Sequence, residues 1–489
     1  MTSSDPPPEH ALTRRALRDG SSSPGTDTGA GVALAERSPD VLEREDGSSS
    51  RGGRALAWVS EDSVGRLTET QPPEPARPLV ERWPRRSPWR PGVLLPIATT
   101  TAVIAAYVVT MLLWPLASVA PTVETFAVES AAAPASDPAW PEAGAAAAAA
   151  TGLGPTVSSS DAVVPMASIT KLVTALVVLD ELPLDEGETG PSFSFDAAER
   201  QSYWDYLAAG ESALPFPETA SLTQVQLMQG MLVGSAGNYA DYLAGLVYPT
   251  EEAYALAATQ WLTTHGLVDI EVVDPSGISP ANTATPAAAV SLGQRALAEP
   301  VIAEIVAAAE VQLPEVGTVE NTNILLDEPG VVGVKTGSLF EDYNLLAAQE
   351  VAVGDTVVQT VVAVLGQPDS ESRFDAARAV LAELSTQVQP TVAVPAGTVV
   401  GRISTRWGAP VDVVTGEDAS VVLWNGGTAS ATPTVALQDE RDEGDTAGSL
   451  RVAGPADSAQ VDAVLAEPVA DPSPWWRLTH PLELLGLAG

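Results

Sequence analysis

The stretch MASITKLVTALVVL, residues 166–179, places a serine and a lysine where an apolar helix begins. Ser168 and Lys171 are three residues apart, and residues with this spacing lie on one face of a helix. We therefore expect the Ser168 hydroxyl and the Lys171 amine to meet within hydrogen-bond distance. A neutral, desolvated lysine activates a serine nucleophile without the help of a histidine. The N-terminal end of such a helix also offers backbone N–H groups to an oxyanion.

Lysine is rare in this chain, so the second lysine is informative as well. Of the 24 basic residues, 22 are arginine and only Lys171 and Lys335 are lysine. Lys335 lies in GVKTGS, residues 333–338, where a strand leads into a Lys-Thr-Gly sequence. Lys335 and Thr336 supply a cation and a hydroxyl for a substrate carboxylate, and Gly337 lets an extended peptide approach the strand edge. This context predicts a chemical role for both lysines.

The composition argues against several classes of function. The 489 residues include no cysteine and only three scattered histidines, which leaves almost no material for thiolate chemistry, a metal cluster or a Ser-His-Asp triad. We therefore expect no histidine-based metal cluster, and the leading functional hypothesis given below implies no metal and no organic cofactor. The chain has 63 acidic and 24 basic residues, and 49 of the acids but only 11 of the bases lie after residue 123. A surface this negative repels phosphates, so we expect no nucleic-acid partner.

The N-terminal part of the chain predicts a membrane anchor. Residues 1–90 are rich in Ser, Pro, Gly and charged residues, which is typical of a disordered tail. An uncharged stretch follows, and within it we expect a transmembrane helix over residues 93–118, since about 20 apolar residues cross a bilayer. Arginines precede this helix and acids dominate after it, which predicts a single-pass protein of the cell membrane with its N-terminus in the cytoplasm. Its remaining residues would then lie outside the cell.

The exterior part divides into four expected segments. A linker over residues 119–140 leads into an α/β domain over residues 141–388, in which a helical cluster packs on a mostly antiparallel sheet. Short alternating apolar runs with Gly and Pro then predict a small all-β module over residues 389–470. A C-terminal tail, residues 471–489, carries Trp475 and Trp476 and is expected to pack against that module.

Residues 160–385 resemble the D-alanyl-D-alanine carboxypeptidases, the low-molecular-mass penicillin-binding proteins. The resemblance rests on PMASITKLVTALVVL (165–179), DPSGISPANTAT (274–285) and TNILLDEPGVVGVKTGSLFEDYNLLAA (322–348). It implies the transpeptidase fold shared by penicillin-binding proteins and β-lactamases. It also implies peptidoglycan stem peptides as substrates and β-lactam antibiotics as covalent inhibitors.

The resemblance further implies roles for individual residues. Ser168 would be the nucleophile and Lys171 its general base, while the backbone N–H groups of Ser168 and Ser338 would form the oxyanion hole. Lys335 and Thr336, with Gly337 beside them, would orient the terminal carboxylate of the substrate. Arg373 lies where the family has a carboxylate-binding arginine.

The second motif of the family, Ser-x-Asn, is irregular in this chain. Residues 235–238 read Ser-Ala-Gly-Asn, so one alignment loses the serine and the other places Gly237 where the asparagine belongs. We expect Asn238 to be the functional amide; either Ser235 supplies the hydroxyl after a small adjustment of the loop, or the motif has no hydroxyl and proton transfer to the leaving D-alanine is slow.

The leading functional hypothesis is a serine-type carboxypeptidase that removes the terminal D-alanine of stem peptides through an acyl-enzyme. Two alternatives stay open at this point. One is a β-lactamase or esterase of the same fold. The other is a non-catalytic wall-binding protein in which the second motif has decayed.

Overall fold

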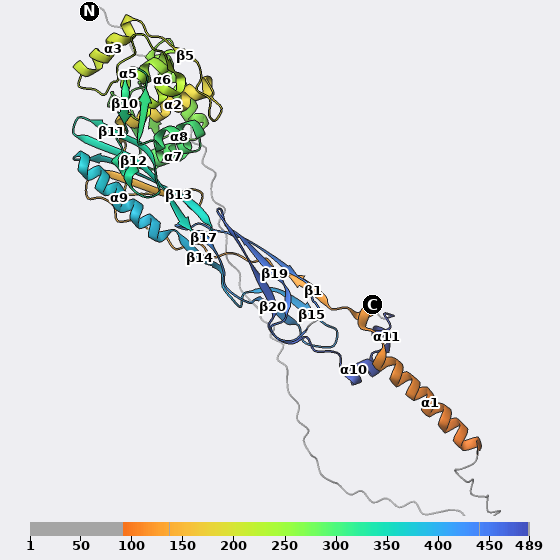
Figure 1. Cartoon of the computed structure of the whole chain (residues 1–489). Coiled ribbons are helices and arrows are strands. Elements are labelled where there is room, and N and C mark those ends of the chain that lie inside the picture. Colours follow the sequence, from red (N-terminus) through yellow and green to blue (C-terminus); the bar gives the residue numbers. More distant parts are fainter. Residues whose placement is uncertain (1–90, 136, 440, 488–489) are drawn as a thin grey trace, which may run out of the picture. The chain divides into compact units, whose positions relative to one another are not determined.

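The computed structural model describes residues 91–135, 137–439 and 441–487. The segment expected as a disordered tail, residues 1–90, lies outside the described residues. The described part begins with a long helix, continues into an α/β region and ends in a β-rich region and two short helices (Figure 1).

A five-stranded antiparallel sheet is the frame of the α/β region. Its strand order is β11-β12-β13-β2-β3, and each neighbouring pair is antiparallel. The strands are β2 (Ala145–Ala150), β3 (Val157–Ser158), β11 (Val331–Leu339), β12 (Asp342–Val353) and β13 (Thr356–Gln367). β11 is an edge strand, and it carries the Lys-Thr-Gly sequence.

Strand β2 shows why both faces of this sheet are covered. It consists of six alanines, all of them buried. Ala147 and Ala149 join one apolar cluster, while the alternate alanines join another, as the two-residue period of a strand requires. Helix α7 (Pro286–Leu297) contacts this sheet with the first cluster, and α9 (Ser370–Gln387) contacts it with the second. The prediction of a helical cluster on an antiparallel sheet is thus confirmed.

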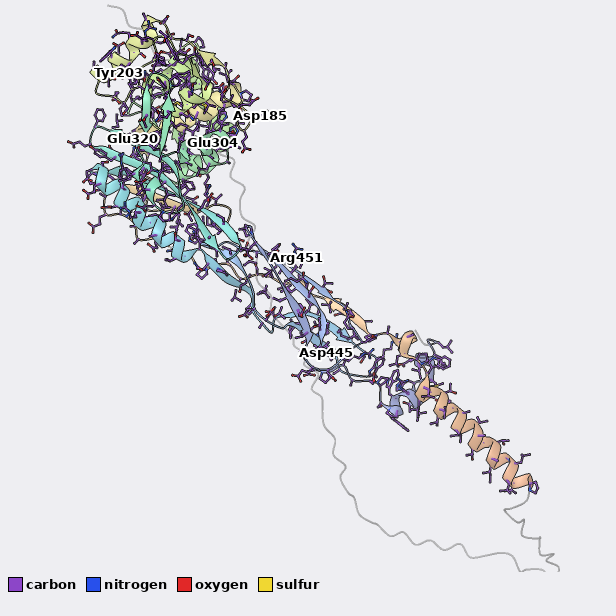
Figure 2. All side chains as sticks on the ribbon, in the orientation of Figure 1. Asp185, Tyr203, Glu304, Glu320, Asp445 and Arg451 are labelled. Carbon is purple, nitrogen blue, oxygen red and sulfur yellow. The ribbon has the colours of Figure 1, made fainter. Side chains whose placement is uncertain are left out.

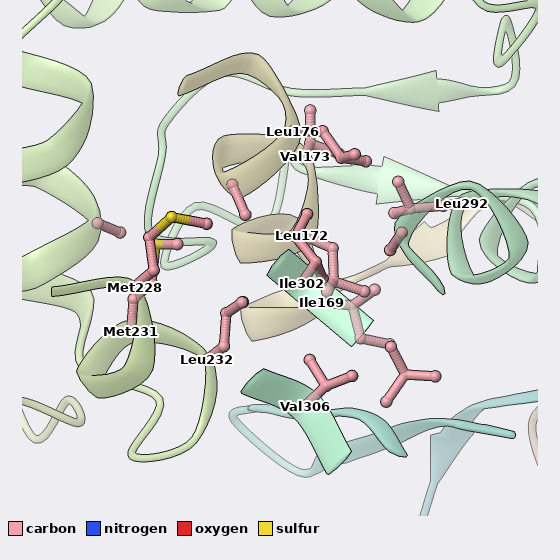
Figure 3. Close-up of a cluster of buried hydrophobic side chains, with 14 of the residues drawn as sticks. Ile169, Leu172, Val173, Leu176, Met228, Met231, Leu232, Leu292, Ile302 and Val306 are labelled. Atoms are coloured by element: carbon pink, nitrogen blue, oxygen red, sulfur yellow. The ribbon is translucent and has the colours of Figure 1, made fainter. Parts of the chain in front are cut away.

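Helix α2 (Thr170–Glu181) runs through the middle of the helical cluster. Ten of its twelve residues are buried, because apolar side chains lie on all faces of the helix and pack against other helices. Ile169, Leu172 and Leu176 lie among side chains of α4, α7 and α8 (Figure 3). A helix held on all sides fixes the position of the residues at its N-terminal end, Ser168 and Lys171.

The remaining elements of the α/β region are short. The helices are α3 (Ala197–Ala208), α4 (Gln224–Leu232), α5 (Gly237–Gly245), α6 (Glu251–Thr264) and α8 (Pro300–Ala307), with 3₁₀ turns η3 (Ala167–Ile169) and η4 (Ile324–Asp327). The strands are β4 (Val164–Pro165), β5 (Ser192–Phe193), β6 (Leu222–Thr223), β7 (Ile270–Glu271), β8 (Thr283–Ala284), β9 (Glu310–Leu313) and β10 (Gly317–Glu320).

The β-rich region has its own apolar core and two sheets. A six-stranded sheet has the order β1-β15-β16-β20-β19-β18, and a two-stranded sheet pairs β14 with β17. The strands are β1 (Thr122–Thr125), β14 (Gln389–Val394), β15 (Val399–Ser404), β16 (Val411–Thr415), β17 (Ala419–Leu423), β18 (Ser430–Val435), β19 (Thr446–Ala453) and β20 (Ser458–Leu465). The segment expected as a linker, residues 119–140, differs from a bare spacer because its β1 pairs with β15.

The long apolar helix meets the C-terminal end of the chain. Helix α1 (Pro91–Leu113) is followed by the 3₁₀ turn η2 (Leu116–Val119), and the chain closes with α10 (Pro474–Thr479) and α11 (Pro481–Leu484). Arg477 donates hydrogen bonds to the carbonyls of Leu112 and Trp114, and Trp476 packs on Trp407 of the β-rich region. The tail therefore contacts the end of α1 as well as the module on which it was expected to pack.

Acidic side chains are spread over the surface of both regions. Asp185, Glu304 and Glu320 are exposed on the α/β region, and Asp445 lies at the rim of the β-rich region (Figure 2). This arrangement matches a solvated acidic exterior rather than a local binding patch.

Loop 274–282 packs against the segment that leads into helix α2. Its Gly277 has a φ of +82°, and a Cβ there would lie 2.1 Å from the carbonyl oxygen of Ala167. The backbone of the loop thus packs directly on the residue before Ser168, and only glycine fits.

We expect Gly277→Ala to lower the free energy of unfolding by about 3 kcal/mol, because positive φ costs about 1–2 kcal/mol and the clash adds a similar amount. Gly266→Ala is the matched control, since Gly266 has a φ of +76° but open space around it. Chemical denaturation of the full-length chain in detergent measures both variants. Equal losses would contradict the close approach of the loop to Ala167.

Candidate active site

Ser168 and Lys171 form the centre of the site. The Lys171 amine donates a hydrogen bond to the Ser168 hydroxyl at 2.9 Å and another to the carbonyl of Ser276 at 2.5 Å. Lys171 is only 2% exposed, whereas Ser168 is partly open to solvent. Ala167, the residue before the serine, has a φ of +50°, a strained conformation of the kind found at functional sites. The expected contact between serine and lysine is present.

The surroundings of Lys171 favour its neutral form. Burial lowers the pKa of its amine to about 8, although the negative charges of Asp241, Asp274 and Glu211 oppose this shift. Near neutral pH an appreciable share of this amine is therefore unprotonated and can accept a proton.

Lys335 faces the same centre from strand β11. Its side chain is 1% exposed, and its amine donates to the Ser235 hydroxyl at 3.0 Å and to the Thr336 carbonyl at 3.1 Å. Burial, followed by the positive charges of Lys171 and Arg373, lowers the pKa of Lys335 well below its usual value. Lys171 and Lys335, the only two lysines of the chain, lie close enough at this site for their positive charges to repel each other.

The irregular second motif is resolved by its geometry. Ser235 has a φ of +60°, and this turn presents its hydroxyl to Lys335. Asn238 is placed differently from the expectation: its amide accepts from the Leu214 N–H at 3.2 Å and donates to the Leu214 carbonyl at 2.8 Å. Both ends of that amide are engaged with the backbone, so Asn238 holds a neighbouring loop. The position two residues after Ser235 is Gly237.

The edge of β11 approaches the nucleophile segment. A Cβ on Gly337 would lie 2.7 Å from the Met166 carbonyl and 3.3 Å from the Ser168 nitrogen. Thr336 is buried and shares a hydrogen bond with Thr322, while Ser338 is exposed. The backbone of this edge and that of Ser168 therefore line one narrow space.

Arg373 lies behind the end of β11. It is 7% exposed, and its guanidinium donates to the Gly337 carbonyl and to the Ser338 hydroxyl, each at 3.0 Å. The ring of Phe374 lies 4.8 Å from its central carbon, but its buried Nε has no hydrogen-bond partner among the described residues. A cation is thus held beside the Lys-Thr-Gly sequence with donor capacity left over.

Sequence reasoning missed several residues that support this centre. Asp274 accepts hydrogen bonds from Ser276, Gly277, Ser279 and Asn282, and although burial opposes it, these bonds hold the pKa of Asp274 below its usual value. This carboxylate fixes the loop whose carbonyl binds Lys171. The signal was present, because the segment DPSGISPANTAT had been singled out as a whole. Tyr206 and Asp241 also lie at this centre, and nothing in their local sequence marks them.

The described residues include no group of three His, Asp or Glu side chains that could hold a metal ion. The groups that meet at the site include the hydroxyls of Ser168 and Ser235, the two lysine amines, the Arg373 guanidinium and backbone N–H groups.

Comparisons with solved structures return D,D-peptidases and penicillin-binding proteins. A Streptomyces DD-transpeptidase is 23% identical with a TM-score of 0.44, and the match covers 50% of this chain and 98% of that one. Penicillin-binding protein 5 from Haemophilus influenzae is 17% identical with a TM-score of 0.47, over 69% of this chain and 100% of that one. A peptidoglycan synthesis regulatory factor from Streptococcus pneumoniae is 18% identical with a TM-score of 0.46, over 67% and 99%. No curated protein matches the chain.

The family of D-alanyl-D-alanine carboxypeptidases matches residues 149–365, which include Ser168, Lys171, Ser235 and Lys335. The match and the antiparallel sheet with its helical cluster confirm the expected fold of the penicillin-binding proteins. The α/β region of the chain is therefore similar, over residues 149–365, to the D-alanyl-D-alanine carboxypeptidase family of serine peptidases.

Proposed function

We propose that this protein removes the terminal D-alanine of peptidoglycan stem peptides through an acyl-enzyme on Ser168. The observation that carries the proposal is the 2.9 Å hydrogen bond between the Lys171 amine and the Ser168 hydroxyl, with the lysine out of contact with water. A base of this kind needs neither a histidine nor a metal.

The first step is acylation. The Ser168 oxygen attacks the carbonyl between the two D-alanines, while its proton passes to the Lys171 amine. The negative oxygen of the tetrahedral intermediate lies between the backbone N–H groups of Ser168 and Ser338. As the C–N bond breaks, the proton that Lys171 took from the serine passes through the Ser235 hydroxyl, which Lys335 contacts at 3.0 Å, to the leaving D-alanine amine, so that Lys171 is neutral again. Water then attacks the ester, its proton goes to Lys171, and the Ser168 hydroxyl is regenerated.

The edge of β11 suits an extended substrate. A peptide that pairs with this strand receives main-chain hydrogen bonds, and Gly337 leaves room for it close to Ser168. The terminal carboxylate then meets Thr336, Ser338 and the charge of Arg373. β-Lactams would enter the same space and stay bound to the serine, because the leaving group remains attached.

We further propose that α1 anchors the enzyme in the cell membrane. The helix has 23 residues, and its apolar window is unburied within the described part of the chain. Arginines before it and acids after it in the sequence support an orientation in which the catalytic region is outside the cell, with its proposed substrate.

Incubation of the full-length chain with benzylpenicillin should add one penicilloyl group to the intact mass, and Ser168→Ala should abolish the adduct. An unlabelled parent chain would favour the non-catalytic wall-binding alternative. Rapid turnover of a chromogenic cephalosporin without a stable adduct would favour the β-lactamase alternative.

We expect Lys171→Arg to lower the rate of acylation by at least about a hundredfold, because arginine stays protonated and cannot act as a base. Time-resolved labelling with a fluorescent penicillin measures this rate. Arg378→Lys is a suitable control, since Arg378 is a surface residue paired with Glu328 and Asp375. A fully labelled Lys171→Arg variant would contradict the role of Lys171.

Acylation should rise with pH, because only the neutral form of Lys171 accepts the serine proton and its pKa is about 8. The rate constant is expected to increase roughly tenfold between pH 7 and pH 9 and then to level off. The pH profile of penicillin labelling tests this directly. A rate that falls over the same interval would contradict a neutral lysine base.

A further inference from the structure

The space beside Gly237 is filled by a side chain from another helix. A Cβ built on Gly237 would lie 2.3 Å from a ring carbon of Tyr206, which belongs to α3. The Gly237 N–H also donates to the Ser212 carbonyl at 2.8 Å, which holds the segment after α3 against the start of α5. Gly237 therefore lacks a side chain at a place where the Tyr206 ring already lies.

The Tyr206 hydroxyl reaches further toward the catalytic centre. It donates a hydrogen bond to the Asp241 carboxylate, and the hydroxyl of Ser276 interacts with it as well. The carbonyl of the same Ser276 accepts the hydrogen bond from Lys171. Tyr206 thus links position 237, Asp241 and the loop that holds the base.

We propose that Tyr206 is a positioning residue of the serine–lysine centre: its ring takes the place of a side chain at position 237, and its phenol holds the Asp241 carboxylate near Lys171. The inference rests on the proposed function, since it assigns Tyr206 a part in the acylation of Ser168. In the irregular Ser-Ala-Gly-Asn motif, the space of a side chain at position 237 would thus be filled by a residue from outside the motif.

The charges around the two groups decide the direction of the effect. Lys171 is acted on by Asp241 of α5, Asp274 of the 274–282 loop and Glu211, and it faces Lys335 of β11. Burial raises the pKa of Asp241 to about 6, and the hydrogen bond from Tyr206 opposes this rise, while the charges of Asp274 and Glu251 add to it. The Tyr206 hydroxyl therefore keeps Asp241 ionised at neutral pH, and the ionised carboxylate keeps Lys171 more basic than burial alone would.

A small cavity gives Asp241 its own contact with water. The cavity has a volume of about 180 Å³ and is lined by Asp241, Tyr248, Glu251 and Pro275 among other residues. Asp241 can thus exchange its proton with solvent through this cavity.

The electrostatic half of the proposal is tested by the pH profile of penicillin acylation of the full-length chain. Tyr206→Phe removes the hydrogen bond to Asp241, and Asp241→Asn removes the charge itself, so each should move the acid limb to lower pH by roughly half a unit or more. Because Tyr206 acts through Asp241, the double variant should shift no further than Asp241→Asn alone. Tyr203→Phe, on the same helix, should leave the midpoint pH of the acylation profile unchanged.

The steric part of the proposal, the contact between Gly237 and the Tyr206 ring, is tested by a second double-mutant cycle. This cycle measures the melting temperature and does not depend on acylation. Gly237→Ala should lower the melting temperature by several degrees, because its Cβ collides with the Tyr206 ring. In a Tyr206→Ala background the same change should cost little.

Two kinds of failure are distinguishable. A labelled parent chain whose midpoint does not move in Tyr206→Phe and Asp241→Asn would overturn the inference alone, as would a Gly237→Ala cost that persists without the Tyr206 ring. A parent chain that penicillin does not label at Ser168 would overturn the proposed function, and the positioning role with it.

Discussion

The site depends on the removal of two amines from water. A lysine in solvent carries its proton at neutral pH and is useless as a base, so the fold must bury it and still provide hydrogen-bond partners. Lys171 meets this demand through Ser168 and the Ser276 carbonyl, and Lys335 through Ser235 and the Thr336 carbonyl. Among the described residues, each amine thus has hydroxyl and carbonyl partners but no direct ion pair with a carboxylate. Their proximity adds repulsion, which acts in the same direction as burial.

The rest of the α/β region can be understood as support for this burial. Helix α2 is enclosed by other helices, so its N-terminal end cannot relax toward solvent when Lys171 gains a proton. The glycines at 277 and 337 allow the loop and the edge strand to approach the nucleophile segment at backbone distance. Strain at Ala167 and Ser235 is maintained by this packing, and both residues adjoin or belong to the reacting groups.

The sequence predicted those features that depend on local spacing or on rare residue types. The contact of Ser168 with Lys171 follows from the helical period, and Lys335 stood out because arginine replaces lysine elsewhere in the chain. The β-rich region was visible as short alternating apolar runs with Gly and Pro. The roles of Asn238 and Tyr206 were not visible. An amide that binds the backbone of a neighbouring loop, as Asn238 binds that of Leu214, looks the same in a sequence as one that faces a substrate. Tyr206 enters the site from a helix about thirty residues before Gly237.

Arg477 has a consequence for how the enzyme is tethered. It satisfies two main-chain acceptors at the end of α1, and main-chain acceptors that emerge from a bilayer without partners are costly. The final turn of the proposed anchor is thus completed by a residue near the opposite terminus of the polypeptide. The segment after the proposed anchor pairs with the β-rich region through β1, and the C-terminal tail contacts both the end of α1 and Trp407, so the anchor is joined to that region by two separate segments of the chain.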